Sequence, residues 1–229
     1  MADRSLSGIR LFDGLQPEAI KELEKRCTWR NFDAGDSIID RNSDSRDVFF
    51  ITSGMARVVN YSFSGREVTF DDVQAGSVFG ELAALDGQPR SANVVALEPT
   101  IAACMTPSVF REVLLQHPRM AVNLSLRLAR IIRASVDRIM DLSTLGANNR
   151  VYAELLRQAR PLADENSRAV ISPVPIHSDV ASRVSTTRET VARVFSELTR
   201  KKLIRRDGDR LIVSNVDRLE EMVEQFRGE

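Results

Sequence analysis

The hydrophobic pattern of this 229-residue chain changes its period once, near Pro107. From about Thr28 to Met105 the apolar runs are short, rich in β-branched and aromatic residues, and separated by glycines. Many short strands at such spacing indicate a β-barrel or sandwich. Beyond Pro107 the apolar residues recur at helical spacing. After a long helix we expect a helix from about Asn149 to Arg160 and a polar connection from Pro161 to Pro175. Two close helices, a basic hairpin and a last helix from about Val216 to Arg227 should follow. We therefore expect an α+β chain, with a β-rich N-terminal part and a helical C-terminal part.

The longest helical stretch runs from about Pro118 to Leu145 without an internal proline or glycine. Its apolar residues follow steps of three and four, as in a coiled-coil seam. A helix of roughly 28 residues is about 42 Å long, more than a small β domain needs to cover itself. We therefore favour a dimer seam over a core helix of one chain. The seam comprises Leu124, Leu128, Ile131, Ile132, Ser135, Ile139 and Leu142.

Composition excludes several classes of protein. The 32 Lys and Arg residues balance 32 Asp and Glu residues, so any nucleic-acid surface must be local. The longest uncharged run, Pro99 to Phe110, is too short to span a bilayer, and no signal peptide is visible. Two cysteines make no disulfide framework, and two distant histidines leave little for a metal centre or a catalytic triad. We expect a cytoplasmic protein without catalytic residues, metal, prosthetic group or membrane contact.

The segment from Phe79 to Ala92 combines groups that suit a bound phosphate. Gly80 would let the backbone approach a ligand closely, and a helix starting at Glu81 would direct free N–H groups at an anion. Arg90 offers a charged fork for phosphate oxygens, and a hydroxyl group follows it. Glu81 can accept a hydrogen bond from a sugar hydroxyl. The same residues also suit a tight turn with a Glu81–Arg90 ion pair at the surface.

Together with the glycine turns, this segment resembles the phosphate-binding cassette of the cyclic-nucleotide-binding domain, a β-roll. The resemblance implies that Gly80 and Ser91 bind the phosphate and that Arg90 supplies the counter-charge. It implies that Glu81 accepts from the ribose 2′-OH, and it adds Leu82 to the set.

By the same resemblance, the base lies against the long helix at Ser135 and Val136. Ser135 could bond the purine edge, or could only ease helix approach. The cyclic-AMP receptors of the family have two successive hydroxyl residues here, whereas Val136 has none. Ser91 could also bond the amino group of a guanine. We therefore favour cyclic AMP as the effector and keep cyclic GMP as a rival.

Residues 176–198 follow a pattern of helix, tight turn and helix. On the second helix, Arg188, Glu189 and Arg193 fall on one face, and such a set suits base edges in the major groove. Thr186 and Thr187 are placed to cap this helix and touch phosphate. The opposite face is apolar and consists of Val191, Val194, Phe195 and Leu198.

Residues 180–210 carry nine basic side chains against four acidic ones, a net charge of +5 in a neutral protein. Alone, this charge suits a solvated basic face, with a capping box between Thr186 and Glu189. A predicted hairpin around Asp207 and Gly208, taken with the two helices, favours DNA binding instead.

This half resembles the winged helix-turn-helix of the cyclic-AMP receptor protein / fumarate–nitrate regulator (Crp/Fnr) superfamily of bacterial transcription regulators, and its receptor-like branch in particular. The resemblance implies DNA contacts by Thr187, Arg188, Glu189, Arg193 and Lys201 with a TGTGA-type palindrome. The family's turn usually has glycine where this chain has serine at 185. A left-handed backbone there would cost about 1 kcal/mol.

The resemblance implies three parts: a β-roll at 1–117, a long dimerisation helix at 118–145 and a winged helix-turn-helix at 146–229. It implies a homodimeric regulator, an activator in our interpretation, that is controlled allosterically by a cyclic nucleotide. The expected partners are double-stranded DNA, a second copy and RNA polymerase.

Two other hypotheses stay open. A relative could act without ligand or sense another signal, such as redox state or a gas through haem. An iron–sulfur version needs about four cysteines, and this chain has two. A metal-dependent β-barrel enzyme needs clustered ligands that the sequence lacks.

Overall fold

The computed structural model describes residues 4–227, with side chains described as far as residue 225. The chain divides into two compact units, Met1–Ile132 and Arg133–Glu229. Helix α4 (Pro118–Thr144) gives residues to both units. The α+β architecture expected from the sequence is confirmed.

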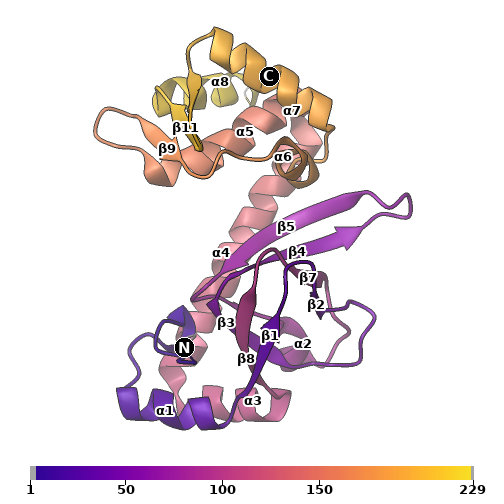
Figure 1. The fold of residues 1–229 in the computed structure, drawn as a ribbon, viewed down its shortest axis with the longest axis vertical. Coiled ribbons are helices and arrows are strands. Elements are labelled where there is room, and N and C mark those ends of the chain that lie inside the picture. Colours follow the sequence, from indigo (N-terminus) through magenta and orange to yellow (C-terminus); the bar gives the residue numbers. More distant parts are fainter. Residues whose placement is uncertain (1–3, 228–229) are drawn as a thin grey trace. The chain divides into compact units, whose positions relative to one another are not determined.

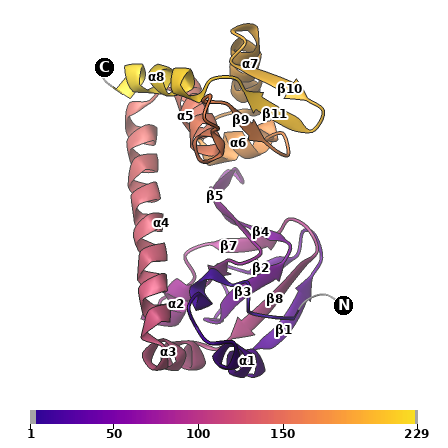
Figure 2. The ribbon, with the colours of Figure 1, turned by 90° about the vertical axis from the view of Figure 1, so that its left-hand side faces the viewer.

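The first unit is built on two four-stranded antiparallel sheets, which form the predicted β-roll (Figures 1 and 2). In spatial order, one sheet contains β1 (Thr28–Phe32), β8 (Thr100–Met105), β3 (Val48–Ser53) and β6 (Val78–Phe79). The other contains β2 (Ser37–Ile39), β7 (Asn93–Ala96), β4 (Met55–Tyr61) and β5 (Glu67–Gln74).

Helices close one end of the roll, where α1 (Pro17–Lys25) and α3 (Pro107–Gln116) lie side by side in both views (Figures 1 and 2). Phe12, Phe50 and Phe110 form a buried aromatic core there, with ring centroids 5.1 and 6.4 Å apart along the series. Met120 of α4 is buried in the same core. The helical segments of this unit, besides the start of α4, are η1 (Arg10–Phe12), α1 (Pro17–Lys25), α2 (Glu81–Asp86) and α3 (Pro107–Gln116).

The second unit packs its helices and a three-stranded antiparallel sheet around one apolar core. The strand order of this sheet is β10 (Ile204–Asp207), β11 (Arg210–Val213) and β9 (Ala169–Ile171). The predicted two-helix motif, hairpin and last helix are all present. The elements are α5 (Ala147–Ala159), η2 (Arg160–Leu162), β9 (Ala169–Ile171), α6 (His177–Arg183), α7 (Arg188–Arg200), β10 (Ile204–Asp207), β11 (Arg210–Val213) and α8 (Val216–Arg227).

Two expectations need correction. The connection predicted between Pro161 and Pro175 contains η2 and the strand β9. That strand has three residues and is stabilised by pairing with β11, a contact that its own sequence does not reveal. Helix α5 begins at Ala147, two residues before the predicted start, with Gly146 as its N-cap.

The apolar residues of α4 fall into two groups. Leu124 is buried in the core of the first unit and Leu128 packs against it, so both are core residues rather than seam residues. Ile132 and Ile139 are about 60% exposed. Exposed apolar side chains on α4 also include Val122, Leu126, Ile131, Val136, Met140 and Leu142. The division into three domains stays a prediction.

Within residues 4–227, no helix has the length and apolar character that crossing a membrane requires.

Candidate functional site

The predicted phosphate cradle begins where β6 ends. Gly80 has a φ of 79° and is the N-cap of α2. A Cβ atom on Gly80 would lie 2.8 Å from Nη1 of Arg90 and 2.9 Å from the carbonyl oxygen of Asp47. The left-handed backbone and this close approach together require glycine.

Arg90 is the most firmly held residue of the cradle, with only 4% of its surface exposed. Its Nη1 donates to the carbonyl of Gly80 at 3.0 Å. Its Nη2 donates to the carbonyl of Asp47 at 2.8 Å and to Oγ of Ser45 at 3.2 Å. Nε is buried without a partner in the described structure. Burial lowers the pKa of Arg90, against the opposing charge of Asp47. The guanidinium is thus fixed by two main-chain carbonyls and the hydroxyl of Ser45, and its Nε–H group has no acceptor among the described residues.

Glu81 is the first residue of α2 and is 5% exposed. Burial raises the pKa of its carboxyl group, against a main-chain hydrogen bond and the charges of Arg127 and Arg90. The alternative of a surface ion pair between Glu81 and Arg90 is wrong, because both residues are buried and the nitrogens Nη1 and Nη2 of Arg90 donate to other groups.

The remaining cassette residues are more accessible. Ser91 is exposed, and its carbonyl accepts from Nδ2 of Asn60 at 3.1 Å. Leu82 is 45% exposed. The first unit therefore brings Gly80, Glu81, Leu82, Arg90 and Ser91 together between β6 and β7.

The two predicted base contacts belong to the second unit. Ser135 and Val136 are exposed residues in the middle of α4. Their contact with a nucleotide base stays a prediction.

Sequence reasoning missed three residues of this site. Ser45 and Asp47, on the loop before β3, support the guanidinium of Arg90. Arg127 on α4 acts electrostatically on Glu81, and its Nε is buried without a partner in the described structure. Arg127 is a charged residue on the otherwise apolar side of the long helix, and this position could have indicated its role from the sequence.

The predicted recognition helix is α7, and its N-cap is Thr187. Oγ1 of Thr187 accepts from the main-chain N of Thr190 at 3.3 Å, so the cap uses this pair rather than Thr186 and Glu189. The hydrogen bond from the main chain at Glu189 lowers the pKa of that carboxyl group, and the Thr187 side chain adds to the effect. The predicted apolar face is buried, through Val191, Val194, Phe195 and Leu198.

The opposite surface of α7 is accessible, and Arg188, Glu189 and Arg193 are exposed. His177 of α6 lies edge-on to Phe195, with ring centroids 5.0 Å apart. Burial lowers the pKa of His177, and the charge of Arg188 acts in the same direction.

Lys201 is the C-cap of α7, where its Nζ pairs with Oε1 of Glu197 at 2.7 Å. Glu197 also accepts from the hydroxyl of Tyr152 at 3.0 Å. Lys201, the predicted phosphate contact, is therefore a cation held in place by Glu197. Its ammonium keeps two of three donors for a further acceptor.

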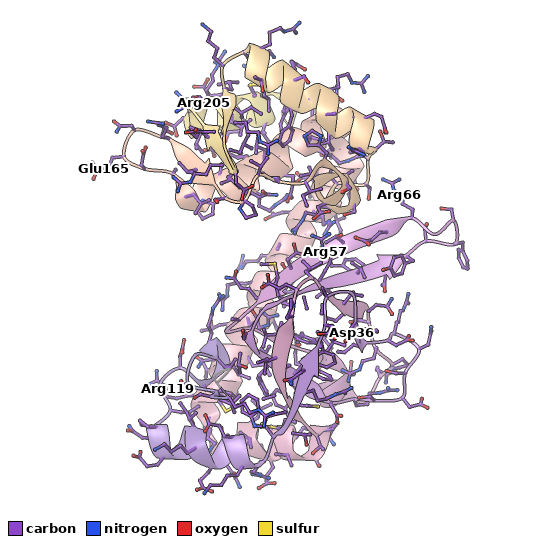
Figure 3. The ribbon with its side chains drawn as sticks, in the orientation of Figure 1. Asp36, Arg57, Arg66, Arg119, Glu165 and Arg205 are labelled. Carbon is purple, nitrogen blue, oxygen red and sulfur yellow. The ribbon has the colours of Figure 1, made fainter. Side chains whose placement is uncertain are left out.

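The turn before α7 adopts the strained geometry that the sequence suggested. Ser185 has a φ of 52°, in the left-handed region that usually favours glycine. Beyond α7, the hairpin carries the exposed residues Arg205 and Arg206 on β10 and Arg210 on β11, and Arg205 is labelled in Figure 3. An exposed helix N-terminus and an exposed basic hairpin are the parts from which a winged DNA-binding module is built.

A metal centre or a redox-active thiol would be the alternatives to a nucleotide site. Among residues 4–227, no cluster of His, Cys, Asp and Glu could hold a metal ion. Burial raises the pKa of the Cys27 and Cys104 thiols to about 12, which favours the protonated form over the nucleophilic thiolate.

The fold and the two sites define a class of protein: a β-roll with an effector cassette, joined to a winged helix-turn-helix. Residues 29–117 match the family model of the cyclic nucleotide-binding domain, and residues 149–222 match that of the Crp-like helix-turn-helix domain. The chain belongs to the Crp/Fnr superfamily of transcription regulators.

Similar proteins span nearly the whole chain. A "CRP-like cAMP-activated global transcriptional regulator" of Mycobacterium tuberculosis is 24% identical over 95% of this chain and 97% of its own length. A "Cyclic AMP receptor protein" of Thermus thermophilus is 29% identical over 87% of this chain and 90% of its own. The solved structure of a CooA mutant from Carboxydothermus hydrogenoformans superposes with a TM-score of 0.79 at 18% identity, covering 92% of this chain and 96% of that one. The last likeness concerns the fold alone.

Proposed function

We propose that this protein is a cytoplasmic, homodimeric transcription activator whose binding to a TGTGA-type palindrome is controlled by a cyclic nucleotide, with cyclic AMP as the favoured effector. The observation that carries the proposal is the buried guanidinium of Arg90. Its Nη1 and Nη2 donate to protein acceptors, Nη1 lies beside a glycine that permits close approach, and the buried Nε has no partner among the described residues.

The cassette fits the phosphate and ribose of a cyclic nucleotide. Arg90 would supply the charge that a cyclic phosphate needs, with Gly80 and Ser91 as further phosphate ligands. Glu81 would accept from the ribose 2′-OH, and the charge of Arg127 favours its ionised form. The accessible Leu82 would border the ribose, and Ser135 and Val136 would face the base. The cAMP-activated relatives support cyclic AMP over cyclic GMP.

The exposed face of α7 fits the major groove. Arg188 at its first position suits a bidentate contact with guanine, and Glu189 can accept from the amino group of cytosine. Arg193 lies further along the same helix. Thr187 and Lys201 at its two ends suit phosphate contacts, which position the helix without reading sequence.

The exposed apolar residues of α4, among them Ile132 and Ile139, suit the seam of a homodimer. Two recognition helices must lie about 34 Å apart to enter successive major grooves of a palindrome. The nucleotide would favour the dimer arrangement that has this spacing. RNA polymerase would be the partner of the DNA-bound activator.

Calorimetric titration with cyclic AMP and cyclic GMP tests the effector. We expect saturable binding, tighter for cyclic AMP. Arg90→Ala should weaken binding by about 2–3 kcal/mol, the value of a charge-assisted hydrogen bond in a partly desolvated site. The exposed Arg10, changed to alanine, provides the control and should bind as the unmodified protein does. Unchanged affinity in Arg90→Ala would show that the cassette is not the nucleotide site, and absence of binding would favour another signal.

A further inference from the structure

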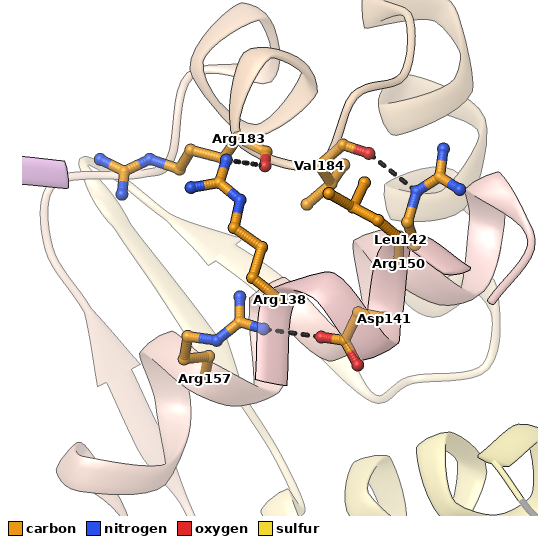
Figure 4. Close-up of a pocket in the computed structure, with 7 residues that line it drawn as sticks. All are labelled: Arg138, Asp141, Leu142, Arg150, Arg157, Arg183 and Val184. Carbon is orange, nitrogen blue, oxygen red and sulfur yellow. Dashed lines mark hydrogen bonds and ion pairs between the residues drawn. The ribbon is translucent and has the colours of Figure 1, made fainter. Parts of the chain in front are cut away.

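Two arginines of the second unit hold the turn between α6 and α7 (Figure 4). Arg138 on α4 donates to the carbonyl of Arg183. Arg150 on α5 donates from Nε to the carbonyl of Val184 at 2.8 Å and from Nη2 to that of Ser185 at 3.0 Å. Three consecutive carbonyls are therefore each bound by a charged donor, at the end of α6 and in the turn that leads to the recognition helix.

The two arginines belong to a compact polar cluster, which also contains Asp141, Glu154 and Arg157. Nη1 of Arg150 also donates to the carbonyl of Leu145, directly after α4, at 3.0 Å. Arg157 pairs with the buried carboxylates of Asp141, at 2.8 Å, and Glu154. The hollow between these side chains holds about 10 Å³, about the room for one water. The polar cluster therefore connects α4, α5 and the α6–α7 turn through hydrogen bonds and ion pairs, and its hollow is too small for an organic ligand.

Arg138, a member of this polar cluster, lies close to the predicted base contact on α4. Ser135 and Arg138 are three residues apart on one helix, so they are neighbours on its surface. The turn that Arg138 holds contains Ser185, whose left-handed backbone is unfavourable for serine. Such a turn needs support from its surroundings to keep one conformation.

We propose that Arg138 is a positioning residue for DNA reading. It ties the α6–α7 turn to α4, so a base bound at Ser135 acts on the orientation of α7 through its neighbour one helical turn away. The inference rests on the proposed control by a cyclic nucleotide and adds the residue that carries it. Arg150 holds the adjoining carbonyls and gives the turn a second fixed point.

The test uses the full-length protein with Arg138→Ala, Arg138→Lys and, as a matched control, Arg133→Ala on an exposed position of the same helix. Affinity is measured for a TGTGA palindrome and for a single-base variant of it, with saturating cyclic AMP. We expect Arg138→Ala to lower affinity for the palindrome about tenfold, as loss of a charged hydrogen bond implies, with a smaller change for the variant. Arg138→Lys should recover part of the loss, and Arg133→Ala should match the unmodified protein.

A purely structural role predicts a different result. Partial unfolding would lower affinity for both duplexes in proportion and leave their ratio unchanged, and that outcome would overturn the inference. Hydrogen exchange of residues 183–187 gives a readout that needs neither nucleotide nor DNA. It should be faster in Arg138→Ala than in Arg133→Ala, and equal rates would also overturn the inference.

The two proposals fail separately. If DNA affinity of the unmodified protein did not respond to cyclic AMP, the proposed effector control would be wrong. The positioning role of Arg138 would then be decided by hydrogen exchange and by the affinity ratio measured without nucleotide.

Discussion

The carboxyl group of Glu81 is buried, and burial disfavours its ionised form. Burial raises its pKa, so the folded protein binds this proton over a pH range in which the unfolded chain has lost it. The free energy of unfolding therefore falls as pH rises through that range, and the ionised carboxylate costs stability at neutral pH. A residue kept at such a cost is expected to serve binding, here as the acceptor for a ribose hydroxyl.

Glu81→Gln should therefore raise the melting temperature at pH 7 and weaken cyclic AMP binding about fivefold, because a neutral amide accepts less strongly than a carboxylate. Binding to the unmodified protein should weaken as pH falls and Glu81 gains its proton, whereas Glu81→Gln should lack this dependence. Calorimetry from pH 5 to 8 and thermal unfolding measure both effects. The exposed Glu98, changed to glutamine, should alter neither. A lower melting temperature in Glu81→Gln would contradict the assigned cost of burial.

For a single element, the proposed DNA contacts of α7 place base reading at one end of the helix and a phosphate contact at the other. Arg188 at its start should discriminate bases by about 1–3 kcal/mol through a guanine contact. Arg188→Ala should therefore lose affinity for the TGTGA palindrome but little for a duplex changed at the contacted base.

Lys201 at the other end of α7 is the matched comparison, since a phosphate contact carries no sequence information. Lys201→Ala should weaken all duplexes alike and lower the slope of log affinity against log salt by about 1 per half-site. Binding series on single-base variants at several salt concentrations measure both effects. Equal loss on every duplex for Arg188→Ala would contradict base reading by α7.

Local sequence determines some elements more fully than others. Helix α4 has a long uninterrupted period and α8 has clear boundaries, so both were predictable within about one residue. Strand β9 was not, because its three residues form a strand only by pairing with β11. Within the site, the motif identified Gly80, Glu81 and Arg90. The support from Ser45, Asp47 and Arg127 comes from segments far apart in the chain, and a linear pattern does not show which of them meet.

At the scale of the whole molecule, the exposed apolar face of α4 predicts self-association. A charge introduced there would have to be buried in an apolar seam, which is costly. Ile139→Asp should weaken dimerisation at least tenfold and leave each protomer folded, because Ile139 is 61% exposed in the single chain. Sedimentation equilibrium measures this change, with Asp137→Ala on the opposite side of the helix as the control. A dimer of unchanged strength in Ile139→Asp would place the interface elsewhere.

The proposed control by a cyclic nucleotide requires that effector binding and DNA binding are coupled. A ligand shifts a two-state equilibrium only through different affinities for the two states, and the coupling is reciprocal. Cyclic AMP should therefore tighten DNA binding, and DNA should tighten cyclic AMP binding by the same factor. Arg90→Ala should remove this coupling while keeping weak, sequence-independent DNA binding.

The most direct test of control by a cyclic nucleotide is the affinity of the full-length protein for a TGTGA palindrome, measured at one salt concentration with and without saturating cyclic AMP. We expect at least tenfold tighter binding with cyclic AMP, a typical allosteric coupling of about 1.4 kcal/mol or more, and no such gain in Arg90→Ala. Equal affinity with and without the nucleotide, or an equal gain in Arg90→Ala, would contradict this control.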